Sequence, residues 1–115
     1  MTERKKRPKT LYQTIGCKDG ASVKTVKTAL SKLILIAHPD KHPGVTDVET
    51  KQYINRCATC VLEVKKILCH PVRRRVYNYL VKSRELPRRH GGIEADFGLI
   101  NQRIDNLIDD CDDDV

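Results

Sequence analysis

The residues of this chain best suited to chemistry are the tripeptide His38-Pro39-Asp40, which directly follows an apolar stretch from Leu30 to Ala37. A proline inside an α-helix removes one hydrogen bond, and it also drives the preceding residue out of helical geometry. A helix must therefore end here, and Pro43 and Gly44 follow as turn residues. The sequence predicts an exposed loop that presents an imidazole and a carboxylate side by side.

A second group with metal-ligand chemistry consists of Cys57 and Cys60, with Cys69 and His70 further along the chain. Tetrahedral zinc needs four converging ligands, and two cysteines three positions apart on a helix supply only two of them. No second CxxC pair is present. Cys57 falls on an apolar helix stripe, where small buried thiols are common. We therefore expect no metal site and no cofactor, and the odd count of five cysteines favours reduced thiols inside a cell.

The elements before the tripeptide are predicted to be helical. A short turn is expected from Leu11 to Ile15, ended by Gly16, and Ser22 is a typical N-cap for a longer helix. The apolar residues of that helix recur at steps of three and four, which places them on one face: Val23, Val26, Leu30, Leu33 and Ala37.

A second long helix is predicted after the loop. Thr46 and Glu49 have the spacing of a capping box, and the apolar pattern continues to about Leu68. Two long helices joined by a short loop are naturally antiparallel neighbours. One face of the second helix is apolar and should be buried: Ile54, Cys57, Ala58, Val61, Val64 and Leu68.

The rest of the chain divides into three predicted parts, and strand signals are weak throughout. A helix starting at Pro71 should turn Val72, Val76, Tyr77 and Leu80 inward and Arg73, Arg74 and Arg75 outward. Residues 83–96 read as a linker, and residues 97–115 as a short amphipathic helix with an acidic tail. The predicted fold class is all-α.

Charge is distributed unevenly along the chain. Residues 1–89 carry 21 basic and 7 acidic side chains, whereas residues 90–115 carry 1 and 8, which together give the net charge of +7. A basic body of this kind is expected to meet an acidic partner. The segment from Arg4 to Lys9, within a basic disordered arm of residues 1–9, could be a nuclear-import signal, a nucleic-acid contact or a solubilising terminus.

No apolar run approaches the roughly 18 residues that a membrane span needs. The basic start is followed by Pro8 and Lys9 and not by the apolar stretch of a secretory signal. We expect an intracellular protein, cytoplasmic or nuclear. No glycine-rich phosphate loop occurs, so we expect neither a nucleotide site nor an enzymatic activity.

With these elements in order, the chain resembles the J domain of DnaJ-type co-chaperones from Thr10 to about Leu80. The landmarks are the opening run from Leu11 to Cys17, an alanine and a Lys-Leu pair in the second helix, the His-Pro-Asp signature, and a basic pair followed by Tyr-Asn. The corresponding residues are Ala29, Lys32-Leu33, His38-Pro39-Asp40-Lys41-His42-Pro43, Arg73-Arg74 and Tyr77-Asn78.

The resemblance implies a four-helix J-domain fold over residues 10–82, with an antiparallel hairpin braced by short first and fourth helices. It also implies binding to a seventy-kilodalton heat-shock chaperone and stimulation of that partner's ATP hydrolysis. Carried over by position, the partner-binding residues would be His38, Pro39, Asp40, Lys24, Lys27, Lys32 and Lys41.

The chain departs from the family pattern at several positions. Ile36 and Ala37 stand where the family has a basic and an aromatic residue, and His70 stands where it usually has aspartate. The stretch from Asp40 to Tyr77 is longer than usual, so either the loop or the third helix is extended. An alternative is a J-fold adaptor that has lost ATPase stimulation and binds another protein or nucleic acid. The tails could also recruit a client.

Overall fold

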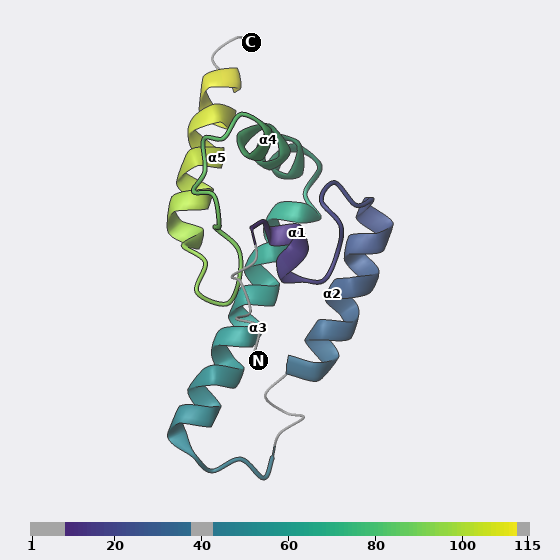
Figure 1. Ribbon diagram of the computed structural model, residues 1–115, viewed down its shortest axis with the longest axis vertical. Helices are drawn as coiled ribbons and strands as arrows, with labels where there is room; N and C mark the ends of the chain where they lie inside the picture. Colours follow the sequence, from purple (N-terminus) through teal and green to yellow (C-terminus); the bar gives the residue numbers. More distant parts are fainter. Residues whose placement is uncertain (1–8, 38–42, 113–115) are drawn as a thin grey trace, which may run out of the picture.

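The computed structural model describes residues 9–37 and 43–112, and within these ranges the chain forms helices and no strands (Figure 1). The all-α prediction is confirmed. Residues 1–8 of the predicted basic arm and the last three residues of the acidic tail lie outside the described part. The helices are α1 (Leu11–Thr14), α2 (Val23–Ala37), α3 (Val48–Leu68), α4 (Pro71–Lys82) and α5 (Phe97–Asp112).

Helices α2 and α3 form the antiparallel pair that the sequence predicted, and they lie side by side in Figure 1. The Oγ of Ser22 accepts a hydrogen bond from the backbone N–H of Thr25 (3.2 Å), so this serine is the N-cap of α2. Val26 and Leu30 are buried, and Leu33 is half-buried. The predicted apolar face of α2 therefore faces the protein.

The N-terminus of α3 differs from the prediction. Asp47 is the N-cap, and its carboxylate accepts hydrogen bonds from the backbone N–H (2.9 Å) and the hydroxyl (2.8 Å) of Thr50. The expected Thr46–Glu49 capping box was wrong by one residue, because an aspartate at the next position serves the same three-residue spacing. These hydrogen bonds, that of the hydroxyl first, lower the pKa of Asp47.

Helix α4 is capped by the residue that departs from the family pattern. The Nδ1 of His70 accepts a hydrogen bond from the backbone N–H of Arg73 (3.2 Å), which is the role an aspartate side chain commonly fills. Tyr77 and Leu80 are buried as predicted. Val72 is not, since 51% of it is exposed. It stands three and seven positions before the exposed Arg75 and Tyr79, so it lies on the solvent side of α4.

Arg73, Arg74 and Arg75 were all expected to point to solvent, but only Arg75 does. The guanidinium of Arg73 bonds the side chains of Asp105 and Asn101 on α5 (2.6 Å each), and that of Arg74 bonds the carbonyl oxygen of Ala21 (2.7 Å). Both arginines are half-buried because neighbouring segments pack against α4. Periodicity within α4 alone could not reveal those neighbours.

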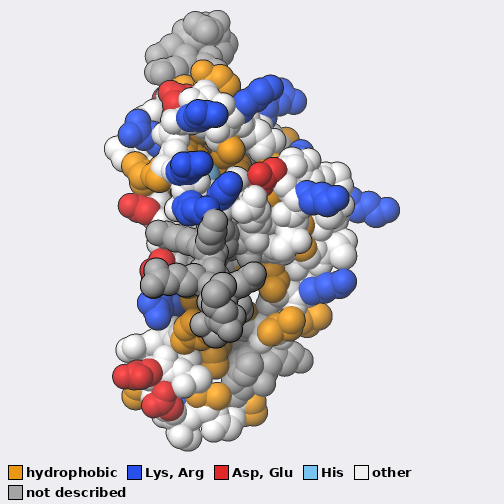
Figure 2. Space-filling model, viewed as in Figure 1, with side chains coloured by type: hydrophobic (Ala, Val, Ile, Leu, Met, Phe, Trp, Pro, Cys, Tyr) orange, Lys and Arg blue, Asp and Glu red, His pale blue; other side chains and the backbone are white. Residues whose placement is uncertain are grey.

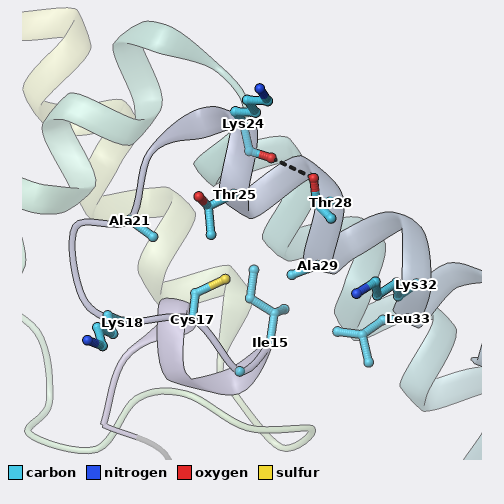
Figure 3. A pocket seen from close by; sticks show the side chains of 11 residues that line it. Ile15, Cys17, Lys18, Ala21, Lys24, Thr25, Thr28, Ala29, Lys32 and Leu33 are labelled. Carbon is cyan, nitrogen blue, oxygen red and sulfur yellow. Dashed lines mark hydrogen bonds between the residues drawn. The ribbon is translucent and has the colours of Figure 1, made fainter.

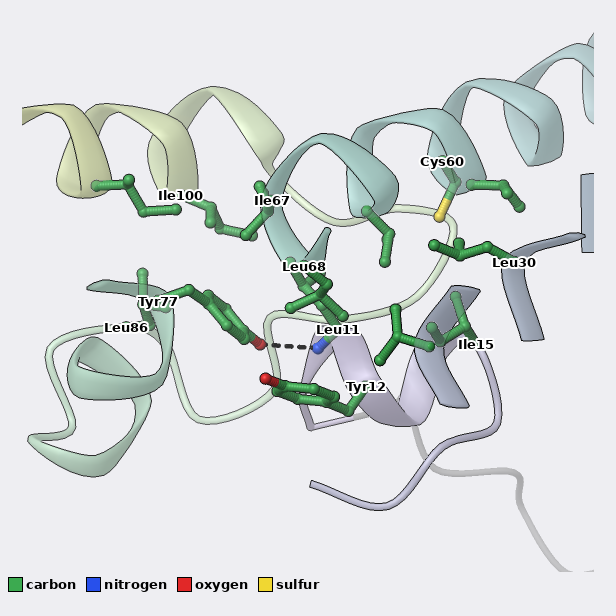
Figure 4. Close-up of a cluster of buried hydrophobic side chains, with 14 of the residues drawn as sticks. Leu11, Tyr12, Ile15, Leu30, Cys60, Ile67, Leu68, Tyr77, Leu86 and Ile100 are labelled. Carbon is green, nitrogen blue, oxygen red and sulfur yellow. Dashed lines mark hydrogen bonds between the residues drawn. The ribbon is translucent and has the colours of Figure 1, made fainter. Parts of the chain in front are cut away.

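The core lies where α1, α2, α3, α4 and α5 meet (Figure 4). It is mainly aliphatic, as the scarcity of aromatic residues in the sequence required. Each of the described helices contributes buried side chains, and those of α2 are Val26 and Leu30. The fully buried residues include Leu11, Leu30, Ile67, Leu68, Tyr77, Leu80, Ile100 and Ile104.

Residues 83–96, expected to be a linker, contain no helix or strand but pack closely on α1. The backbone N–H of Gly92 donates to the Oγ1 of Thr14 (2.7 Å), and that of His90 donates to the carbonyl oxygen of Lys9 (3.2 Å). Leu86 is buried in the core. The segment leads into α5, which lies beside α4 in Figure 1.

Candidate functional site

Helix α2 ends at Ala37, directly before the tripeptide. Ala37 is also the last described residue before the tripeptide, so the helix end expected at Pro39 stays a prediction from the sequence. His38, Pro39, Asp40 and Lys41 themselves lie outside the described residues. What the structure describes of this site is the helix that presents them.

The solvent face of α2 is basic. Lys24, Lys27 and Lys32 are all exposed, as their positions off the apolar stripe predicted. The Oγ1 of Thr28 donates to the carbonyl oxygen of Lys24 (3.0 Å), so the hydroxyl of this threonine is bonded to the backbone of its own helix. Long cationic side chains on one helix face accelerate encounter with an acidic surface.

A hollow lies between this face of α2 and the segment after α1 (Figure 3). Ile15 and Cys17 line it from one side, and Ala29 and Leu33 line it from α2. Lys24 and Lys32 stand at its rim. Partial burial raises the pKa of the Cys17 thiol. The hollow is thus an apolar strip edged by lysines and opens toward solvent.

The end of α2 next to the tripeptide is apolar on its outer side. Leu35 and Ile36 are 63% and 67% exposed, and Figure 2 shows hydrophobic side chains on the surface at the lower end of the molecule. On α3, Val48 and Tyr53 are also exposed. This end of the α2–α3 pair therefore has exposed apolar side chains on both helices.

Helix α1 is attached to α4 through two tyrosine hydroxyls (Figure 4). The backbone N–H of Leu11 donates to the hydroxyl of Tyr77 (2.8 Å), and the hydroxyl of Tyr12 donates to Oδ1 of Asn78 (2.6 Å). The two rings lie 6.1 Å apart. The sequence landmarks at the two ends of the resemblance are thus direct neighbours in space.

The model of the DnaJ domain matches residues 10–78, which is more than half of the 115 residues. This chain belongs to the DnaJ-domain family. Neither the search of curated proteins nor the search of solved structures gave a match. The family assignment confirms the resemblance read from residues 10–80. J domains generally act as co-chaperone modules of seventy-kilodalton heat-shock chaperones and are typically not enzymes.

A buried chain of hydrogen bonds, which the sequence did not indicate, joins α4 to the 83–96 segment. The Tyr77 hydroxyl also bonds Nε2 of His90 (2.7 Å), and Nδ1 of His90 bonds the carbonyl oxygen of Pro87 (2.8 Å). A carbonyl only accepts, so Nδ1 carries the proton and Nε2 accepts from Tyr77. Burial raises the pKa of Tyr77 above its ordinary value. No local signal marks His90, which lies outside the matched residues.

The cysteines of the J domain do not converge. Cys60 is buried, and its Sγ donates to the carbonyl oxygen of Gly92 (3.5 Å), whereas Cys57 is only half-buried. Within residues 9–37 and 43–112, no three His, Cys, Asp or Glu side chains lie close enough to hold a metal ion. No helix in those ranges has the length and apolar character that a membrane span requires.

Cys60 should make the protein sensitive to alkali. Burial, and secondarily Cys57, raise the pKa of the Cys60 thiol from 9.0 to about 11. Between these values the thiol ionises in the unfolded chain but not in the folded one. The free energy of unfolding should therefore be undiminished below pH 9 and fall as pH rises toward 11.

Urea unfolding at pH 8 and pH 10.5, followed by circular dichroism, measures this effect. We expect Cys60→Ala to reduce the pH-dependent loss of stability, and the half-buried Cys69→Ala to leave it as in the wild type. An equal loss in Cys60→Ala and wild type would contradict the assignment to Cys60.

Proposed function

We propose that this J domain binds the ATPase domain of a seventy-kilodalton heat-shock chaperone and stimulates its ATP hydrolysis. The observation that carries the proposal is the His38-Pro39-Asp40 tripeptide at the end of α2, inside the matched DnaJ domain. The chain acts on its partner's nucleotide site and contributes no nucleotide site of its own.

Each residue of the proposed contact has a separate task. The carboxylate of Asp40 accepts charge-assisted hydrogen bonds from a basic group of the partner, and Pro39 limits the loop shapes lost on binding. Lys24, Lys27, Lys32 and Lys41 steer the encounter toward an acidic surface. The exposed positions of the three lysines on α2 support this division of tasks.

A single-turnover ATPase assay with a purified heat-shock chaperone tests the proposal. Wild type should raise the rate of hydrolysis, and Asp40→Asn or His38→Gln should abolish the effect at the same concentration. Loss of one charged hydrogen-bond partner costs about 2 kcal/mol, or roughly thirtyfold in affinity. Asp109→Asn, an equal charge change on an exposed part of α5, is the matched control. Stimulation by Asp40→Asn equal to that of wild type would refute the proposal.

The exposed Leu35 and Ile36 favour a second candidate, an adaptor that binds another protein through this apolar end of α2. A contiguous apolar surface beside a functional loop is typical of protein contacts. The two candidates differ in a pulldown with the chaperone. Capture of the chaperone that is lost in Asp40→Asn favours the co-chaperone, whereas the absence of chaperone capture by the wild-type chain favours the adaptor.

A further inference from the structure

A basic cavity of about 580 Å³ lies where the 83–96 segment meets α1 and α4. Lys9, Arg84 and Arg88 line it together with one acidic residue, Asp19, and the buried side chain of His90. Among the described residues, no carboxylate forms an ion pair with any of these three basic side chains. The cavity therefore holds a local excess of positive charge.

The acidic residue of the cavity is already engaged. The Oγ1 of Thr10 donates a short hydrogen bond to Oδ1 of Asp19 (2.5 Å). The hydrogen bond fixes the position of the carboxylate but leaves its negative charge, so the three basic side chains of the cavity face one acidic side chain. Both nitrogens of His90 are also bonded, to Tyr77 and to Pro87. An incoming ligand would meet the cationic side chains.

Arg84 stands at a backbone position that normally favours glycine. Its φ is +60°, its N–H donates to the carbonyl oxygen of Val81 (3.2 Å), and the N–H of Glu85 donates to that of Leu80 (3.0 Å). This pair of hydrogen bonds is the Schellman motif that closes a helix, with the left-handed residue usually glycine. An arginine here carries a conformational cost that its guanidinium, at the cavity, can offset.

The solvent face of α4 carries a second group of basic residues, which flanks an exposed aromatic residue. Tyr79 is 56% exposed and lies between Arg75 and Lys82 at helical steps of four and three, so the three share one face. Figure 2 shows Lys and Arg side chains gathered over the upper part of the molecule, around α4. Basic residues beside an exposed aromatic ring match a phosphate chain with unpaired bases.

We propose that these two groups together bind single-stranded nucleic acid, which would pass from the cavity to the solvent face of α4 around the C-terminal end of that helix, where Lys82 and Arg84 are two residues apart. The first group is Lys9, Arg84 and Arg88, and the second is Arg75, Tyr79 and Lys82. The arginine guanidinium groups bond phosphate oxygens, and Tyr79 stacks on a base. An acidic peptide would use the same charges but not the exposed ring, and a duplex would keep its bases stacked away from it.

This surface belongs to α4 and the segment after it, whereas the proposed chaperone contact belongs to α2 and the tripeptide. The two proposals are independent, and Asp40→Asn should leave nucleic-acid binding unchanged. A chain with both would bring a chaperone to a nucleic-acid complex.

Fluorescence anisotropy of the full chain with labelled (dT)20 and (U)20 tests the proposal. Loss of one phosphate contact lowers the slope of log affinity against log salt by about 0.7, which is about fourfold in affinity at 150 mM salt. We expect Arg84→Gly and Arg88→Gln each to weaken binding by about this factor. Tyr79→Leu should weaken it by about fivefold or more, through lost stacking.

The matched control is Arg56→Gln, which removes the same charge from an exposed position on α3. Arg84→Gly also separates binding from folding, since glycine suits a φ of +60°. Its melting temperature should equal that of the wild type or exceed it by up to about 4 °C, while its binding falls.

Three results would overturn the proposal. The first is no binding of either oligonucleotide by the wild-type chain at 150 mM salt. The second is a loss in Arg56→Gln equal to that in Arg84→Gly and Arg88→Gln, which would mean a response to net charge only. The third is equal binding of poly-glutamate or of a duplex of the same length, which would exclude selection of single strands.

Discussion

Replacing both Ile100 and Ile104 by alanine is expected to lower the melting temperature by at least about 15 °C. Both side chains are fully buried, at 1% and 0% exposure, in the core that α5 shares with α3 and α4. Truncating a buried isoleucine to alanine costs about 2–5 kcal/mol, and a domain of this size has only about 5–15 kcal/mol of stability. Thermal unfolding followed by circular dichroism measures the change.

The matched control is Leu35→Ala with Ile36→Ala, two aliphatic truncations at exposed positions of α2. These should change the free energy of unfolding by less than about 0.5 kcal/mol each. The double variant in α5 also tests whether this helix folds together with the DnaJ-matching residues. An α5 that unfolds separately, with residues 10–78 retaining the wild-type melting temperature, would contradict the expectation.

Gly91→Ala is expected to destabilise the protein by about 3 kcal/mol, although it adds a single methyl group. An added Cβ would lie 2.5 Å from the carbonyl oxygen of Thr10 and 2.5 Å from the Oγ1 of Thr14. The first of these atoms belongs to the backbone at the start of α1 and cannot rotate away. The 83–96 segment would have to move off α1, which would break the hydrogen bond from Gly92 to Thr14.

Urea unfolding gives the loss of stability, and hydrogen exchange shows where it arises. The amides of Gly92 and of α1 should exchange faster in Gly91→Ala than in the wild type. Gly44→Ala is the control, because an added Cβ there meets no atom within 4 Å. Equal stability of the two glycine variants would show that the 83–96 segment can shift without loss.

The sequence alone determined the parts of this protein that depend on local signals. Apolar residues at steps of three and four predicted α2 and α3, and Ser22 predicted the beginning of α2. The order of these signals also predicted the DnaJ family, which residues 10–78 confirm. Such signals span only a few residues, so they can be recognised without knowledge of the fold.

Local signals were misleading where the exposure of a side chain depends on a segment distant in the sequence. Arg73 and Arg74 looked solvated, but α5 and Ala21 supply their partners. Asp47 replaced Thr46 as the cap of α3, because two adjacent residues of similar capping strength cannot be ranked by spacing alone. The partner-binding roles of His38, Pro39, Asp40 and the lysines stay predictions from the family pattern.

Only the tertiary structure decided what residues 83–112 do. Residues 83–96 have the glycines, proline and charges typical of a linker, yet His90, Gly91 and Gly92 pack against α1. An amphipathic helix was predicted after them, but only the structure shows that its residues Ile100 and Ile104 are buried in the core. The same folding places Arg84 and Arg88 beside Lys9 around one cavity. Contacts between opposite ends of a chain depend on shape and hydrogen-bond geometry in three dimensions, and no periodicity or motif along the sequence records them.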